Sequence, residues 1–128
     1  MIIESIYSIL FNDAGVNAAV SGRIYPNMAL LGADFPLIVF SNPSSAPTPT
    51  KDNASVIDIH DIQVDIYSAT ALQAGNISAL IRALLDRYTG VVEGHNIQSI
   101  QLRGMQTSFE PEQDLYRIIL SFSLRECL

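Results

Sequence analysis

The feature that most constrains the fold is the stretch from residue 56 to residue 88, where a strand pattern changes directly into a helix pattern. From Ile62 to Tyr67 apolar and polar residues alternate, which predicts a strand with one buried face. Upstream the apolar positions are odd-numbered, so the alternation changes phase across His60 and Asp61. A β-bulge there, or a strand that changes the surface on which it packs, would explain the change.

The helix pattern follows at once. Thr70 and Gln73 have the spacing of a capping box, in which two side chains satisfy free amides at a helix start. One apolar stripe at helical spacing consists of Ile77, Leu80, Ile81, Leu84, Leu85 and Tyr88. The helix is expected to end before Gly90, and its stripe should form the core with the even-numbered faces of the strands.

The N-terminal part predicts small elements around one buried strand. The expected elements are helices at 2–11 and 14–20, a short strand at 23–25, a loop at 27–34 and a strand at 36–40. Asn12 or Asp13 would cap the second helix. The run from Leu37 to Phe40 is continuously apolar, which is typical of a strand buried on both faces.

Residues 42–55 are rich in Pro and Ser and hold too little apolar surface to offset the cost of ordering. We expect an exposed, flexible loop, or the mobile tip of a long hairpin, that divides two strands and not two domains. A disordered connector and an arm that contacts a partner both remain open. The candidate partner-contact residues of such an arm are Pro43, Pro47, Pro49 and Lys51.

The C-terminal part predicts two alternating strands, at 97–103 and 116–124, with an acidic turn at 109–114. Ile119 lies on the polar face of the last strand, so either a neighbouring subunit covers it or it is an ordinary exposed Ile. The element order predicts a single α+β domain over residues 1–128, with a mostly antiparallel sheet packed by one long helix and short N-terminal helices.

The charge of the chain is acidic, with seven Lys and Arg against thirteen Asp and Glu and a formal net charge of −6. The basic residues are scattered singly, so no cluster is available for tight binding to nucleic-acid phosphates. With no apolar run of membrane-spanning length and no basic segment of a secretion signal, we expect a soluble, cytosolic protein that contacts no membrane. The single Cys127 cannot form an internal disulfide.

No recognised catalytic or cofactor-binding motif is present. His60 and His95 stand far apart and neither has the spacing of a metal ligand. Asp58, Asp61 and Asp65 are close in sequence, but Asp58 lies on the opposite strand face unless a bulge intervenes, and a Ca²⁺ or Mg²⁺ site would need more oxygen ligands. We therefore expect no catalytic, cofactor or metal site, and no enzyme.

Four segments together resemble the tail-completion proteins, or tail terminators, of long-tailed bacteriophages and prophages, a family similar to the tail terminator of phage lambda. The segments are DAGVNAAVSGRIYP at 13–26, FPLIVF at 35–40, QVDIYS at 63–68, and FEP at 109–111 followed by LYR at 115–117. They occur in the family's order and spacing, and the match extends from about Ile6 to Arg125.

The resemblance implies a small α+β subunit that assembles as a homo-oligomeric ring, commonly a hexamer. The ring would cap the tail tube, join it to the head connector and let DNA pass, in a virion assembled in the host cytoplasm. Acidic side chains would keep DNA from binding the channel wall. The candidate channel-facing residues are Asp58, Asp61, Asp65, Glu110, Glu112 and Asp114.

Two other functions remain open, namely a different head–tail connector or neck protein, and a small regulatory domain that binds a metabolite between helix and sheet. The mass in solution separates them. A ring has a multiple of the 14.0 kDa chain mass, whereas a ligand-binding domain should be a monomer or a dimer.

Overall fold

The computed structural model of the chain describes residues 1–48 and 57–128. The elements in chain order are α1 (Ile2–Asn12), α2 (Ala14–Val20), β1 (Ile24–Pro26), β2 (Leu37–Pro47), β3 (Ile57–Ser68), α3 (Ala71–Leu85), β4 (Gly90–Val92), β5 (His95–Glu110) and β6 (Leu115–Cys127). The strands form one sheet in the order β1-β2-β3-β6-β5-β4. β1 pairs with β2 in parallel, and the other neighbours are antiparallel.

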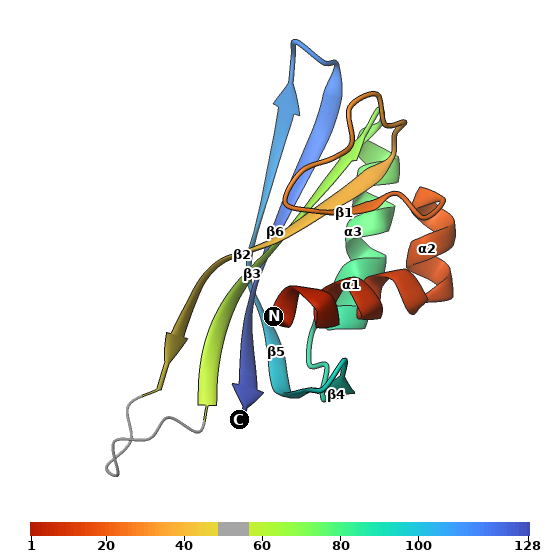
Figure 1. Cartoon of the computed structure of the whole chain (residues 1–128). Helices are drawn as coiled ribbons and strands as arrows, with labels where there is room; N and C mark the ends of the chain where they lie inside the picture. Colours follow the sequence, from red (N-terminus) through yellow and green to blue (C-terminus); the bar gives the residue numbers. More distant parts are fainter. Residues whose placement is uncertain (49–56) are drawn as a thin grey trace.

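All three helices lie on one face of the sheet (Figure 1), which corrects the expectation of one long packing helix. α3 has 15 residues and packs on β3, β6 and β5. α1 covers β1 and β2 and also reaches β4, while α2 packs against both α1 and α3. The cover is therefore shared between the N-terminal helices and α3. None of the described helices is long and apolar enough to span a membrane.

Side-chain caps set the helix starts where the sequence predicts them. The Val16 amide donates to Asp13 Oδ2 at 2.9 Å, so Asp13 is the cap of α2. The Gln73 amide donates to Thr70 Oγ1 at 3.2 Å, which caps α3. In place of the second hydrogen bond of that predicted capping box, the Gln73 side chain accepts a hydrogen bond from Ser68 Oγ at 2.6 Å.

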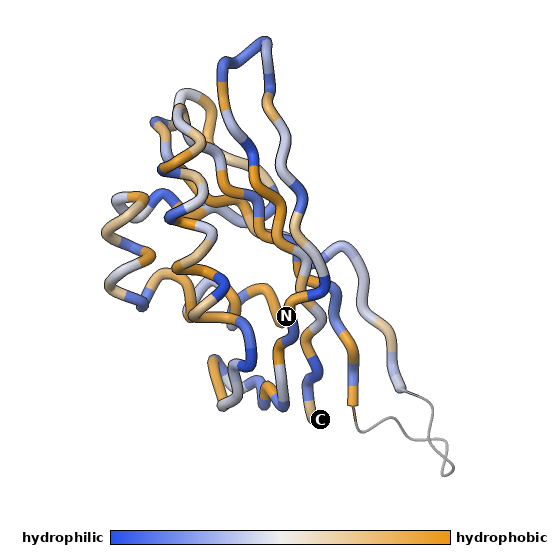
Figure 2. Tube along the Cα trace, turned by 180° about the vertical axis from the view of Figure 1, so that it is seen from behind, coloured by the Kyte–Doolittle hydropathy of each residue, from blue (hydrophilic) through white to orange (hydrophobic). Residues whose placement is uncertain are grey.

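The core lies between the helices and the even-numbered strand faces, as predicted. Its members on α3 and the central strands are Ala74, Ile77, Ile81, Leu85, Ile62, Val64, Ile66, Ile118, Leu120, Phe122 and Leu124. Leu84 and Tyr88 pack against this core, whereas Leu80 is exposed, so the buried stripe of α3 is narrower than predicted. In Figure 2 hydrophobic residues run along the central strands, and the tip of the β5–β6 hairpin is hydrophilic.

The bulge expected at His60 and Asp61 is not in β3. β3 pairs with β6 from Ile57 to Ser68 without a shift in register. His60 is buried on the same face as Ile62, so the even-numbered face stays covered along the strand. The extra residue lies in the neighbouring strand β2, where the register shifts between Ser41 and Ser44.

Part of the stretch predicted as a loop is strand. Residues 42–47 belong to β2 and pair with β3, with Pro47 opposite Asp58. Proline is tolerated in strands at bulges and at sheet edges. Pro43 lies at the bulge, and Pro47 lies on a part of β2 that forms an edge of the sheet, because β1 pairs only with residues 38–40 of β2. Pro49 and Lys51 lie outside the described residues, and the flexibility of this loop stays a prediction.

β5 and β6 form a hairpin that is much longer than predicted and extends past the helices (Figure 1). The turn is confined to residues 111–114, so Glu110 ends β5. Residues 104–109 are exposed on both faces, which explains why their sequence shows no alternation. The short β4, in a stretch interpreted as a turn, was also not predicted.

Candidate functional site

The sheet face away from the helices, here called the open face, is lined by cross-strand rows of mostly polar side chains. One row is formed by Ser41, Gln63 and Ser121, and the next by Asp61, Ser123 and Gln101. A third row joins Val39, Asp65, Ile119 and Gln106. Hydroxyl and amide groups thus dominate a surface that a folded monomer leaves without helical cover.

One ion pair crosses the open face. Arg117 Nη2 donates to Asp65 Oδ2 at 2.6 Å, and Gln63 Nε2 donates to Asp65 Oδ1 at 3.0 Å. The guanidinium lies 5.5 Å from the centre of the Tyr67 ring, and its Nη1 is 3.9 Å from Glu110 Oε1. The hydrogen bond to Asp65 raises the pKa of Arg117, and burial raises the pKa of the Tyr67 phenol although the Arg117 charge opposes it. The charge of Asp65 is therefore balanced within the subunit.

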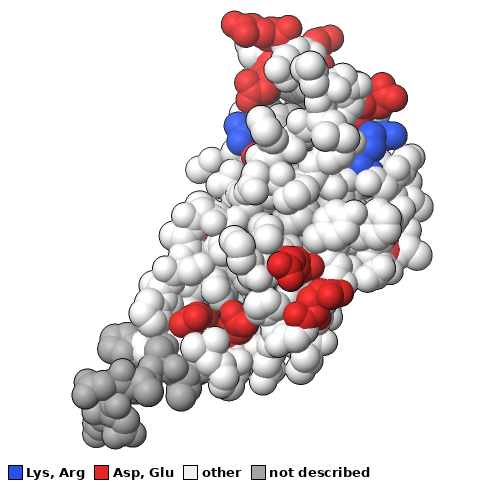
Figure 3. All heavy atoms as spheres, in the orientation of Figure 1, with Lys and Arg blue, Asp and Glu red and all other residues white. Residues whose placement is uncertain are grey.

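The six acidic candidates for a channel wall fall in three places. Asp61 and Asp65 lie on the open face, Asp58 lies on the helix-side face, and Glu110, Glu112 and Asp114 lie at the hairpin tip. Asp61 is exposed and accepts a hydrogen bond from Ser44 Oγ at 2.5 Å. Figure 3 shows acidic side chains gathered at the tip, with few basic ones on this side of the molecule. That these residues face a channel stays a prediction.

A loop with exposed apolar side chains lies over one end of the open face. Its Met28, Leu30 and Leu31 have exposed fractions of 76%, 69% and 105%. Loop and sheet border an open cleft of about 720 Å³ whose lining includes Leu115 and Arg117. The sequence indicates that these apolar residues need cover, and the described residues do not provide it. Grouped exposed apolar side chains mark surfaces that bind other proteins.

β5 presents a free backbone edge within the part of the chain that the structure describes. β4 pairs only with residues 95–97 of β5. Beyond them, the Ile100 carbonyl accepts a hydrogen bond from the Arg87 amide, and the Leu102 amide donates to Asp86 Oδ1. Residues 104–110 pair with β6 on their other side and have no strand on this one. They contain no Pro and carry exposed Met105 and Phe109, and a register shift and the charges of Arg103 and Glu110 lie only at the two ends of this edge, so its middle is open to strand addition.

The candidate partner-contact residues lie on exposed or half-buried positions where the structure describes them. Pro43 and Pro47 are exposed on β2, and Ile119 is half-buried on the open face opposite Asp65 and Gln106. Pro49 and Lys51 lie outside the described residues. Contact of these residues with a partner stays a prediction.

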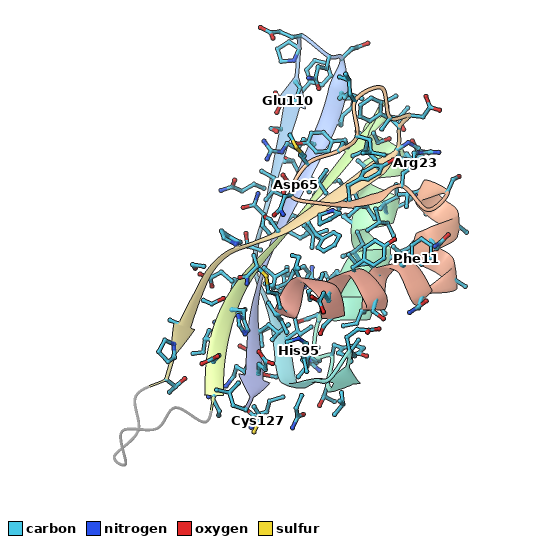
Figure 4. The ribbon with its side chains drawn as sticks, in the orientation of Figure 1. Phe11, Arg23, Asp65, His95, Glu110 and Cys127 are labelled. Atoms are coloured by element: carbon cyan, nitrogen blue, oxygen red, sulfur yellow. The ribbon has the colours of Figure 1, made fainter. Side chains whose placement is uncertain are left out.

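At the other end of the helix-side face, where Figure 4 labels His95, a polar cluster that the sequence did not predict joins the two histidines. Glu126 Oε1 lies 2.8 Å from His60 Nε2, and Glu126 Oε2 lies 2.5 Å from His95 Nδ1. Because a carboxylate only accepts, both imidazoles donate to it, and His60 Nδ1 forms a hydrogen bond with Ser45 Oγ at 2.6 Å. Burial would raise the pKa of Glu126, but the hydrogen bonds from His95 and His60 outweigh burial and lower it.

The sheet order explains how this cluster forms. His60 and His95 come from β3 and β5, and β6 lies between these strands and places Glu126 between the two rings. Neither histidine has a sequence neighbour that would reveal the contact. Only the pairing of strands that are distant in sequence brings the three residues together.

Comparisons with known proteins identify a family and a similar fold. The family model described as "Tail completion protein gp17" matches residues 4–126. A chain from a solved structure titled "Virion of native gene transfer agent (GTA) particle" aligns with a TM-score of 0.83 and 17% sequence identity, covering 97% of this chain and 92% of that chain. At this identity the second match shows a shared fold. No curated protein matches the sequence.

Proposed function

Because this chain belongs to the tail completion protein gp17 family, as its sequence resemblance predicts, we propose that it is the ring subunit that closes the tail tube of a phage or phage-like particle. Identical subunits form a closed ring, with a hexamer as the expected state. The ring joins the tube to the head connector and lets DNA pass, in particles assembled in the host cytoplasm. The fold shared with a gene transfer agent virion chain supports a structural role of this kind.

The free edge of β5 is the observation that carries the proposal. Backbone groups of residues 104–110 can accept a strand from a neighbouring copy. The outer edge of β2 differs, because Pro43 and Pro47 remove two donors from it. A contact between two different surfaces of identical subunits is head-to-tail, which generates rings when the rotation closes.

The open face is the surface that the proposal assigns to the channel. Its side chains are mainly hydroxyls and amides, and its Arg117 is held by Asp65 instead of being free to bind phosphate. Asp61 adds an exposed negative charge. Repulsion acts only at close range, because the screening length is about 8 Å at physiological salt. A wall of this kind lets DNA slide without holding it.

Native mass spectrometry, with and without tail tubes, tests the assembly. The full chain should form a species at a multiple of 14.0 kDa. Met105→Lys adds a charge beside the free edge of β5 and should reduce that species to monomer while the fold is kept. Leu72→Lys on α3, at an apolar residue that is more exposed than Met105 (77% against 54%), is the control and should assemble normally. Normal rings from Met105→Lys would contradict assembly through the β5 edge.

A DNA titration at low salt tests the channel. The assembled protein should not bind duplex DNA, because acidic residues outnumber basic ones by thirteen to seven. Micromolar, salt-sensitive binding would contradict the sliding channel and favour a connector protein that grips DNA. The family match favours both structural functions over a metabolite-binding regulatory domain.

A further inference from the structure

Two carboxylates face each other across the central strand pair on the helix-side face. Asp58 of β3 is directly opposite Glu126 of β6 in the register of the ladder. Like charges at directly opposite positions destabilise a strand pair. In residues 1–48 and 57–128, no Lys or Arg forms an ion pair with either carboxylate. A cation between the two would remove this repulsion.

An imidazole completes a group with the composition of a metal site. His60 follows Asp58 by two residues on β3 and therefore lies on the same face. One nitrogen of His60 and one oxygen each of Asp58 and Glu126 lie within 4.8 Å of one another. His60 and Glu126 are buried and Asp58 is half-buried, so the group is shielded but reachable from solvent.

We propose that Asp58, His60 and Glu126 bind a divalent transition-metal ion of the zinc class. The ion takes the place of the proton between His60 Nε2 and Glu126 Oε1, which are 2.8 Å apart, and the neutral imidazole then carries its proton on Nδ1, where it donates to Ser45 Oγ. Water takes the fourth position. A tetrahedral zinc site places its ligand atoms roughly 3.4 Å apart, so side-chain rotations are sufficient to close the present group around an ion.

The surrounding hydrogen bonds already orient two of the ligands. The hydrogen bond between Ser45 Oγ and His60 Nδ1, 2.6 Å long, directs Nε2 of the same ring toward Glu126. His95 Nδ1 holds the second oxygen of Glu126 at 2.5 Å. Metal-binding imidazoles and carboxylates usually have such partners, which fix their tautomer and orientation. The mixture of nitrogen and oxygen ligands favours zinc-class ions over Ca²⁺ and Mg²⁺, which prefer oxygen alone.

The ion would link β3 to β6 at one end of the sheet. Titration of the full-length, metal-free protein with Zn²⁺ by calorimetry should show one ion per chain. A hundredfold excess of free Zn²⁺ over the dissociation constant should raise Tm by roughly 5 to 10 °C. Co²⁺ should give the visible absorption of a four-coordinate ion, and Ca²⁺ should have no effect. Absence of Zn²⁺ binding, or equal binding of Ca²⁺, would overturn the proposal.

Asp58→Asn distinguishes loss of metal binding from loss of stability, because Asp58 takes no part in the hydrogen bonds that join the two histidines to Glu126. This variant should bind Zn²⁺ at least about tenfold more weakly. Its metal-free Tm should stay the same or rise, since the repulsion from Glu126 is removed. Asp61→Asn, on the opposite face of β3, is the control and should change neither quantity. Unchanged Zn²⁺ affinity in Asp58→Asn would show that the ion binds elsewhere.

Discussion

Asp65 and Glu126 are buried carboxylates on the neighbouring strands β3 and β6, but they lie on opposite faces of the sheet and have different partners. On the open face, Asp65 is paired with Arg117, whose charge is permanent. On the helix-side face, Glu126 accepts hydrogen bonds from His60 and His95. The buried carboxylate of the open face thus has a permanent cation as its partner, whereas that of the helix-side face has two imidazoles.

The largest expected loss of stability comes from a substitution in the apolar part of the helix-side face. Phe122→Ala removes a fully buried ring and should lower the free energy of unfolding by about 3 to 5 kcal/mol. Ser121→Ala, the next residue along β6 but on the open face, should change it by less than about 0.5 kcal/mol. Urea unfolding of both variants measures the difference, and similar losses would mean that the two faces are assigned wrongly.

Glu126→Ala should have the next largest effect. It leaves two imidazoles without the acceptor that they share in a buried position, which costs about 2 to 4 kcal/mol. The loss should appear in metal-free protein at neutral pH, in the midpoint of urea unfolding. A loss below about 0.5 kcal/mol would indicate that the cluster is solvated instead of closed.

Arg117→Met should lower the free energy of unfolding by less than Glu126→Ala does, by about 1 to 2 kcal/mol. Arg117 is partly exposed, and Asp65 keeps its hydrogen bond from Gln63 after the guanidinium is removed. The same unfolding measurement compares it with Glu126→Ala. If Arg117→Met were the more damaging of the two, the open-face pair would be the stronger determinant of stability.

The smallest expected effect is a change in how the stability of the protein depends on pH. The pKa of Glu126 is lowered from its ordinary value of 4.5, because the hydrogen bonds to histidine outweigh burial. The stabilisation from this carboxylate is therefore present above about pH 4.5 and is lost as the pH falls through the lowered, folded-state value. Glu126→Gln should make the stability curve flatter in this acid range. An unchanged slope would assign the acid sensitivity to other groups.

The two faces also differ in how well the sequence predicts them. The core of the helix-side face follows from two periodicities, the stripe of α3 and the alternation of β6, so residues such as Ile81 and Phe122 were identified correctly. The α2 cap at Asp13 follows from its residue type in the same way. These features depend on neighbours within about four positions in the chain.

The unpredicted features depend on pairing between distant strands. The Glu126 cluster exists because β6 lies between β3 and β5, an order that no local pattern encodes. The prolines of residues 42–47 suggest a loop, and their place on an edge is visible only once the sheet is known. The β5–β6 hairpin was predicted too short because both of its faces are exposed near the tip, which removes the alternation.

Negative-stain electron microscopy of tail tubes incubated with the purified protein tests whether the chain forms a tube-closing ring. A ring with a central pore should appear at one end of each tube, and the mass of the ring should be a multiple of the 14.0 kDa chain. Bare tube ends in the presence of excess protein, together with a monomeric mass in solution, would contradict it.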